Sequence, residues 1–235
     1  MSVKSDKKQK ALELKEAKKT GEMSFLDHLE ELRWHIIRSL IAVVVLAVFA
    51  FIIQDFIFQE IIFKPKMPDF WTNRMFRKLA LYLGSDALII NQNELQLINI
   101  KLPGQFTMSM WAAMISGLIL AAPVVFREFW KFIKPALYEN EKKVANQAVF
   151  YTSVLFLIGV LFGYYLIVPL SIQFFSSYSI SPEVSNQINI TSYISMVMSI
   201  VFASGVVFLL QVFSYSLTKV GLVTPEFMRT YRKHA

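Results

Sequence analysis

Long apolar runs separated by charged segments dominate the hydrophobic pattern of this chain. Four stretches contain no Asp, Glu, Lys or Arg: 39–54, 102–126, 144–182 and 184–218. A helix needs about 20 predominantly apolar residues to cross a bilayer, and each stretch, with its apolar flanks, is long enough. The pattern therefore predicts an all-α, polytopic membrane protein. Its four transmembrane helices are expected at about residues 36–56, 106–127, 148–170 and 193–217.

The pattern changes between the first two predicted helices, where two shorter amphipathic segments occur. Residues 55–62 (DFIFQEII) and 75–83 (MFRKLALYL) each place apolar side chains on one face of a helix. Such helices are typical of segments that lie along a membrane interface. The intervening "KPKMPDFW" supplies two prolines and aromatic anchors. We expect this region to form an ordered cap on the extracytoplasmic side, rather than a slack linker.

The N-terminal segment has a different composition from the rest of the chain. Residues 1–23 are rich in Lys, with interspersed acids and few large apolar groups. A secretory signal peptide fits this segment poorly, because the charged region is long and no small-residue cleavage site follows the first apolar run. We expect a charged cytoplasmic tail over residues 1–23 and a membrane domain over residues 24–235.

The basic residues between the spans orient the predicted helices. The segment up to Arg38, the 127–147 connector and the segment from Lys219 together hold eighteen Lys and Arg, whereas residues 54–105 and 176–192 hold six. Basic residues are enriched on the cytoplasmic side of membrane proteins. This asymmetry predicts a multi-pass protein with both ends of the chain in the cytoplasm.

Composition narrows the possible functions. Charged residues make up 17% of the chain, mean hydropathy is +0.47 and net charge is +7; soluble domains average about 25% charged residues. We interpret the net charge as topology and contact with anionic lipids, because the basic groups are scattered over short loops instead of forming a nucleic-acid-binding patch. Cysteine is absent, and the three histidines are dispersed. Catalytic triads, zinc motifs and phosphate loops are also missing, so we expect no enzyme activity, cofactor or metal.

Residues 24–40 crowd acidic groups against the first apolar run. On a helix, Phe25, Leu29, Leu32 and Ile36 form one stripe, while the acids gather on the opposite face. Asp27 is explained by a capping pattern with Ser24 and by the helix dipole. Glu31 lies two turns into the helix, where the dipole effect has faded. It could pair with His35 at i+4, but an exposed pair contributes little.

The connector "AAPVVFREFWKFIKPALYENEKK" (residues 121–143) is the second informative stretch. Pro123 lies inside the second span and should kink or loosen it. Trp130, Phe132 and Tyr138 are typical of an aromatic belt at the membrane interface. The simplest interpretation is an interfacial anchor followed by solvated charges.

Weaker signals lie in the last two spans. Gly159 and Gly163 form a G-x-x-x-G pattern that can let helices approach closely, and Gln211 is a bulky amide in an apolar span that favours a helix–helix contact. Charged residues are absent from the span centres, which disfavours a coupled transporter, since ion pathways usually contain them. A small permease or channel subunit remains the alternative to a receptor that captures a cationic peptide at the cytoplasmic surface.

The chain resembles the TatC family, the multi-span core and receptor subunit of the twin-arginine protein translocase. The resemblance is carried by "FLDHLEELRWHIIRSL", "LAAPVVFREFWKFIKPALYENEKK", "FLIGVLFGYYLIVPLSIQFF", "TSYISMV" and "GLVTPEFMRTYRKHA". It implies a receptor in the bacterial cytoplasmic (inner) membrane that binds the Arg-Arg signal peptides of folded proteins. The family acts with TatA and TatB in export driven by the proton gradient, which implies a homo-oligomer within a larger complex.

The resemblance also implies roles for individual residues. Glu31 and Glu141 match the family's two signal-peptide carboxylates, and Arg33 and Phe132 match further positions of the same motifs. Pro65 matches the proline of the first outer loop, with Pro68 as the second candidate.

Two features depart from the family pattern. The family continues with two further spans, to a total of six, so we expect this four-span sequence to be a truncated form. A polar family position in the fourth span is occupied by Leu209, and Gln211 lies two residues further on. Gln211 is therefore only a candidate for partner contact.

Overall fold

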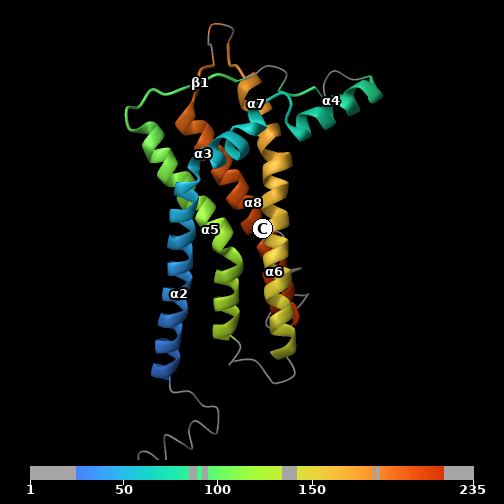
Figure 1. The fold of residues 1–235 in the computed structure, drawn as a ribbon. Coiled ribbons are helices and arrows are strands. Elements are labelled where there is room, and N and C mark those ends of the chain that lie inside the picture. Colours follow the sequence, from blue (N-terminus) through green and yellow to red (C-terminus); the bar gives the residue numbers. More distant parts are fainter. Residues whose placement is uncertain are drawn as a thin grey trace, which may run out of the picture.

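A computed structural model describes residues 25–84, 89–91, 95–133, 142–181, 183 and 186–219. Long helices run side by side through most of the molecule, and short elements gather at one end (Figure 1). The long helices are α2 (Phe25–Ile52), α5 (Gly104–Ile133), α6 (Lys142–Phe162) and α8 (Ile190–Lys219). A short π-helical segment, η5 (Gly163–Ile167), joins α6 to α7 (Val168–Ser177).

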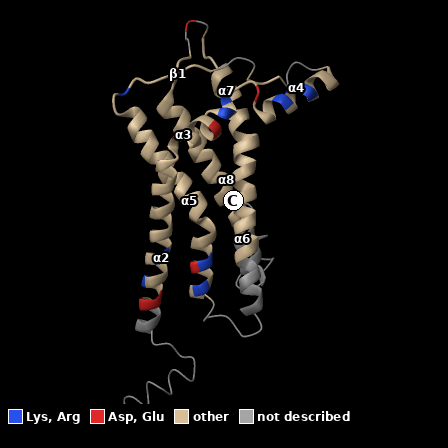
Figure 2. Ribbon diagram, in the orientation of Figure 1, with Lys and Arg blue, Asp and Glu red and all other residues tan. Residues whose placement is uncertain are grey.

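Four helical segments are long and apolar enough to span a bilayer, as the sequence predicts. They are Leu29–Ile52, Gly104–Ile133, Val149–Ser177 and Ile190–Gln211. The third segment is longer than expected, because the chain stays helical past Pro169 to Ser177. In the described part of these segments, charged residues occur only toward one end, and the middle of the bundle carries none (Figure 2).

The outer surface of α2 is apolar and exposed. Ile36, Leu40 and Ile52 are each more than half exposed. Of the apolar stripe predicted at the start of this helix, Leu29 and Ile36 are exposed, while His35, which contacts α5, is buried. These positions suit a bilayer, where lipid solvates exposed apolar side chains and a polar side chain is placed between helices.

Small residues bring the long helices into close contact. A Cβ atom on Gly117 of α5 would lie only 2.5 Å from the backbone of Ala47 in α2. A Cβ atom on Gly159 would lie 2.8 Å from the carbonyl oxygen of Ser204 in α8, and one on Gly163 would lie 2.7 Å from the hydroxyl of the same serine. The predicted G-x-x-x-G contact is therefore confirmed: it lets α6 pack against α8.

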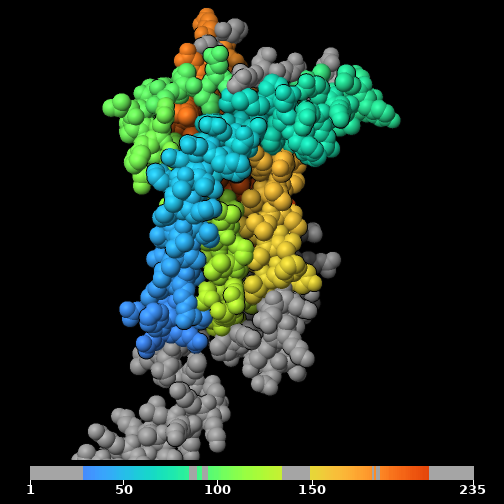
Figure 3. Space-filling model, viewed as in Figure 1, coloured from blue at the N-terminus to red at the C-terminus, as the bar shows by residue number. Residues whose placement is uncertain are grey.

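The cap consists of the short elements between α2 and α5, together with a two-stranded sheet. It lies where α2 ends and α5 begins, and α4 projects sideways beyond the long helices (Figures 1 and 3). Its elements are α3 (Gln54–Phe56), the π-helical η1 (Ile57–Ile62), the 3₁₀ turn η2 (Lys64–Lys66), α4 (Trp71–Leu83), β1 (Leu97–Ile98) and β2 (Ile188–Asn189). The strands pair in parallel, with Leu97 opposite Ile188. The prediction of an ordered, helical cap is thus confirmed.

Neutral side chains of the cap form hydrogen bonds to the third spanning segment, Val149–Ser177. Pro169 has no N–H to return to the preceding turn, and the Thr72 hydroxyl donates to the carbonyl of Tyr165, four residues before it. Asn91, at a positive φ of 48°, donates its side-chain N–H groups to the Pro169 carbonyl at 3.0 Å and to Asn73 Oδ1 at 3.2 Å. We call Thr72, Asn73 and Asn91 the amide cluster.

The predicted prolines have different surroundings. Pro65 is fully buried in η2, and its carbonyl accepts a hydrogen bond from Asn73 Nδ2. Pro123 lies inside α5, which stays helical through it. The helix changes direction along its length (Figure 1), as expected for a helix with a proline in its interior.

Candidate functional site

A cluster of ionisable side chains joins α2 to α5 at the end of the bundle opposite the cap. It consists of Glu31, His35 and Arg38 on α2 with Glu128 and Lys131 on α5. We call it the α2–α5 cluster. Figure 2 shows charged residues on α2 and α5 at the end of the bundle opposite the cap. The spacing of four and three residues places each set on one side of its helix, so the two sets face each other where the helices pack.

Glu128 is the most enclosed acid of this cluster. Its side chain is 8% exposed. One carboxylate oxygen lies 2.7 Å from His35 Nδ1, and the other accepts a hydrogen bond from Lys131 Nζ at 2.9 Å. Arg38 Nη1 approaches the first oxygen to 3.8 Å. Three nitrogen groups therefore surround this carboxylate and compensate its charge.

Glu31 has a different environment. Its Oε1 lies 3.9 Å from His35 Nε2, which is beyond hydrogen-bond distance. Its Oε2 is buried and has no hydrogen-bond partner in the described part of the protein. A buried carboxylate oxygen without a donor is costly. The Glu31 side chain as a whole is 34% exposed, so a cation can reach it and use its remaining capacity to accept hydrogen bonds.

The structure brings some of the predicted site residues together. Phe132 packs edge-on against His35, with ring centroids 6.3 Å apart, so Glu31 and Phe132 share one neighbour. Arg33 is exposed on α2 and lies outside the cluster. Glu141 lies outside the described residues.

Gln211 shares an exposed surface with apolar side chains. It is exposed near the end of α8, beside Leu210, which is 61% exposed. Leu209 is half-buried. The amide of Gln211 is thus available at a surface that otherwise suits lipid.

Sequence reasoning missed Glu128 and underestimated His35. Glu128 stands between Arg127 and Lys131 in a stretch otherwise dominated by aromatic residues. A carboxylate with a lysine at i+3, at the end of an apolar helix, was an available signal of a membrane-edge ion pair. The partnership with His35 had no local signal, since 93 residues separate the two.

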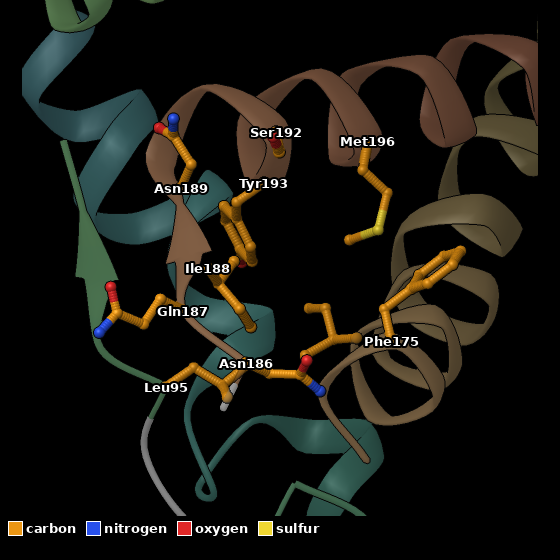
Figure 4. Close-up of a pocket in the computed structure, with 10 residues that line it drawn as sticks. Leu95, Phe175, Asn186, Gln187, Ile188, Asn189, Ser192, Tyr193 and Met196 are labelled. Carbon is orange, nitrogen blue, oxygen red and sulfur yellow. The ribbon is translucent and has the colours of Figure 1, made fainter. Parts of the chain in front are cut away.

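A hollow lies beside the cap, between the end of α7, β2 and the start of α8. Its volume is about 590 Å³. Ile188 and Tyr193 face Phe175 and Met196 across it, while Asn186 lies at its edge (Figure 4). The side chains that line it are apolar groups, amides and hydroxyls, and none of them is charged. The hollow therefore has no negative charge to pair with a cationic ligand, whereas the α2–α5 cluster has two carboxylates.

Metal binding gains no support from the described residues. They contain no group of three or more His, Asp or Glu side chains arranged to hold a metal ion. The chemistry available in the α2–α5 cluster is therefore ion pairing and hydrogen bonding by carboxylates.

Comparisons with known proteins agree on one family. The model of the family "Sec-independent protein translocase protein (TatC)" matches residues 27–235. A TatC protein from Blattabacterium sp. subsp. Periplaneta americana is 38% identical over 217 residues, which cover 92% of this chain and 82% of the relative. One from Aquifex aeolicus is 28% identical and covers 90% of this chain and 79% of the relative.

A solved structure also resembles this fold. It is described as "Crystal Structure of Twin Arginine Translocase Receptor- TatC in DDM", and it matches with a TM-score of 0.70 at 27% identity. The match covers 88% of this chain and 82% of the solved chain.

Proposed function

The chain belongs to the TatC family of Sec-independent protein translocases, and from this premise we propose that it is the receptor that binds Arg-Arg signal peptides through Glu31. Its relatives are named as translocase proteins, a transport role rather than catalysis. The observation that carries the proposal is the buried, unpartnered Oε2 of Glu31 at the charged end of a membrane-spanning helix.

Arginine suits this carboxylate better than lysine does. A guanidinium presents paired N–H donors that match both oxygens of a carboxylate, whereas an ammonium offers a point charge. A hydrogen bond to a charged group contributes about 1.5–3 kcal/mol. Two arginines on two carboxylates would then give micromolar-scale recognition once the cost of ordering is subtracted.

The second carboxylate of the proposed receptor is Glu141. It follows Pro135 and the "ALY" segment in the connector that leads to α6. Phe132 would provide an aromatic wall beside the peptide, and Arg33, which is exposed on α2, would contact the polar groups of the peptide. These roles rest on the family motifs.

Membrane topology and partners complete the proposal. The α2–α5 cluster faces the cytoplasm, as the Lys and Arg distribution favours. The protein resides in the bacterial cytoplasmic membrane, contacts its anionic lipids and assembles as a homo-oligomer with TatA and TatB. The exposed Gln211 amide on α8 provides one partner contact, because a polar side chain at a lipid-facing surface favours hydrogen bonding to another helix.

Photo-crosslinking in membrane vesicles tests the proposed receptor role. The full chain is incubated with a signal peptide that carries a photoreactive residue next to its arginine pair. Glu31→Gln or Glu141→Gln should reduce crosslinking about tenfold, in line with the loss of one charged hydrogen bond. A Lys-Lys peptide should crosslink weakly to the unmodified chain.

Glu60→Gln is the matched control, because it removes a half-exposed carboxylate from the cap without touching the α2–α5 cluster. It should leave crosslinking unchanged. Equal crosslinking of the Glu31 and Glu141 variants and the unmodified chain would refute the proposed receptor site.

A further inference from the structure

His35 stands between the two carboxylates of the α2–α5 cluster. Its Nδ1 lies 2.7 Å from Glu128, and its Nε2 lies 3.9 Å from Glu31. The ring therefore has one hydrogen-bonded nitrogen and one nitrogen that faces a carboxylate without bonding to it. Phe132 covers the ring from α5, so its orientation is fixed by packing as well as by Glu128.

The Glu128 contact decides where the imidazole carries its proton. Lys131 and Arg38 lie next to Glu128 and favour its ionised form. An ionised carboxylate can only accept hydrogen bonds, so Nδ1 of His35 must be the donor. In the neutral ring, Nε2 then has a lone pair and no hydrogen.

This proton position affects Glu31. Nε2 faces Oε1 of Glu31 at 3.9 Å, and without a hydrogen it cannot donate to that oxygen. The other oxygen, Oε2, has no hydrogen-bond partner in the described part of the protein, so both oxygens of Glu31 can accept from a ligand. With the opposite tautomer, Nε2–H would point at Glu31 and occupy its accepting capacity. Among the described residues, the charged groups near the ring are Glu31 and Arg38 from α2 and Glu128, with Lys131, from α5.

We propose that Glu128 is a positioning residue that keeps Glu31 available for the incoming guanidinium by holding the His35 proton on Nδ1. The inference rests on the proposed receptor function. Glu128 does not need to touch the peptide. Its role is like that of the carboxylates that lie behind metal-binding histidines and fix the tautomer of the ring.

Three variants separate this role from a purely structural one. Glu128→Met removes the acceptor for Nδ1, so the ring should turn its N–H toward Glu31 and signal-peptide affinity should fall about tenfold. Glu128→Gln keeps an acceptor oxygen and should retain most of the affinity. The double variant His35→Phe/Glu128→Met has no ring N–H to occupy Glu31, so it should bind more tightly than Glu128→Met alone.

Affinity is measured with a labelled Arg-Arg signal peptide and the full chain in lipid nanodiscs. A structural defect predicts that the double variant is as weak as Glu128→Met or weaker, and that result would overturn the inference. Equal affinity of Glu128→Met and the unmodified chain would also overturn it. If Glu31→Gln has no effect on peptide affinity, the proposed receptor site itself is wrong. If Glu31→Gln loses peptide affinity but Glu128→Met does not, only the proposed role of Glu128 is rejected.

A spectroscopic measurement tests the tautomer without any peptide. The chain has three histidines, His28, His35 and His234, so ¹⁵N-histidine spectra are simple, and His35→Phe identifies the signal of His35. The unmodified protein should show the proton on Nδ1, and Glu128→Met should move it to Nε2. A proton on Nε2 in the unmodified protein contradicts the inference.

Discussion

The polar clusters at opposite ends of the bundle differ in how their groups are paired. In the amide cluster, the side-chain N–H groups of Asn73 and Asn91 all find acceptors, and the one oxygen without a partner, Asn91 Oδ1, is neutral. In the α2–α5 cluster, the unpartnered oxygen belongs to the carboxylate of Glu31. A buried neutral oxygen without a partner costs less free energy than a buried carboxylate oxygen without one.

This difference indicates different roles for the two ends. The amide cluster joins the cap to the third span and has no charge to offer a ligand, so its contribution is to stability. In the α2–α5 cluster, no side chain of the cluster donates a hydrogen bond to the Glu31 carboxylate, which can therefore accept one from a ligand. Variants of the first cluster should therefore change stability, and variants of Glu31 should change binding.

Asn91→Ala should produce the largest loss of stability. It removes two side-chain hydrogen bonds, leaves their acceptors unpaired and places alanine at a positive φ of 48°. Together these effects should lower the free energy of unfolding by about 2–4 kcal/mol. Denaturant titration in detergent micelles measures this change, and the affinity of the folded protein for an Arg-Arg peptide should stay the same.

Asn91→Gly is the matched control for the backbone. It loses the same hydrogen bonds, but glycine adopts a positive φ without strain, so it should be about 1 kcal/mol more stable than the alanine variant. Weakened peptide binding in folded Asn91→Ala would contradict the separation of the two ends.

Thr72→Val should have the next largest effect. Valine keeps the shape of threonine but cannot donate to the Tyr165 carbonyl, which Pro169 leaves without its helical partner. We expect a loss of about 1–2 kcal/mol in the same denaturant titration. Thr72→Ser retains the hydroxyl but loses the methyl group, and it should recover most of that loss. If Thr72→Val is as stable as the unmodified chain, the hydrogen bond does not contribute to stability.

The sequence predicts the spans well because lipid constrains them strongly. Every backbone polar group in a bilayer must be paired within its own element, so a run of about 20 apolar residues has few alternatives to a helix. The cap helices were also predictable, since their apolar residues repeat with helical spacing. The stop at Ile52, before the expected 56, reflects the short helical turns that begin the cap.

The pairings between distant residues were not predictable in the same way. Thr72 and Tyr165 are separated by 93 residues, and so are His35 and Glu128. Spacing along one helix shows which side chains share a face, but it does not show which face of another helix they meet. Glu31 stood out in the sequence because neither the helix dipole nor the capping pattern explained it, whereas the sequence analysis did not single out Glu128.

Glu31→Gln should have the opposite effect to the cap variants: it should weaken peptide binding without lowering stability. The amide removes an unpaired charge, so stability should stay constant or rise by about 0.5–1 kcal/mol, as is common where a functional site holds an unfavourable group. Peptide affinity should nevertheless fall. A stability loss comparable to that of Thr72→Val would show that Glu31 is a structural residue and that its counter-charge is already present in the protein.

Glu60→Gln should have the smallest effect. Glu60 and Lys64 form an i,i+4 pair at 3.1 Å in the cap, with both side chains about half exposed. Water screens such a pair, so its loss should change the free energy of unfolding by less than about 0.5 kcal/mol and leave peptide affinity unaltered. A larger change in either measurement would mean that removing any carboxylate perturbs this protein. If Glu60→Gln has no effect, the effects at Glu31 are assigned to its buried, unpartnered Oε2, because Glu60 carries the same charge but is half exposed and paired with Lys64.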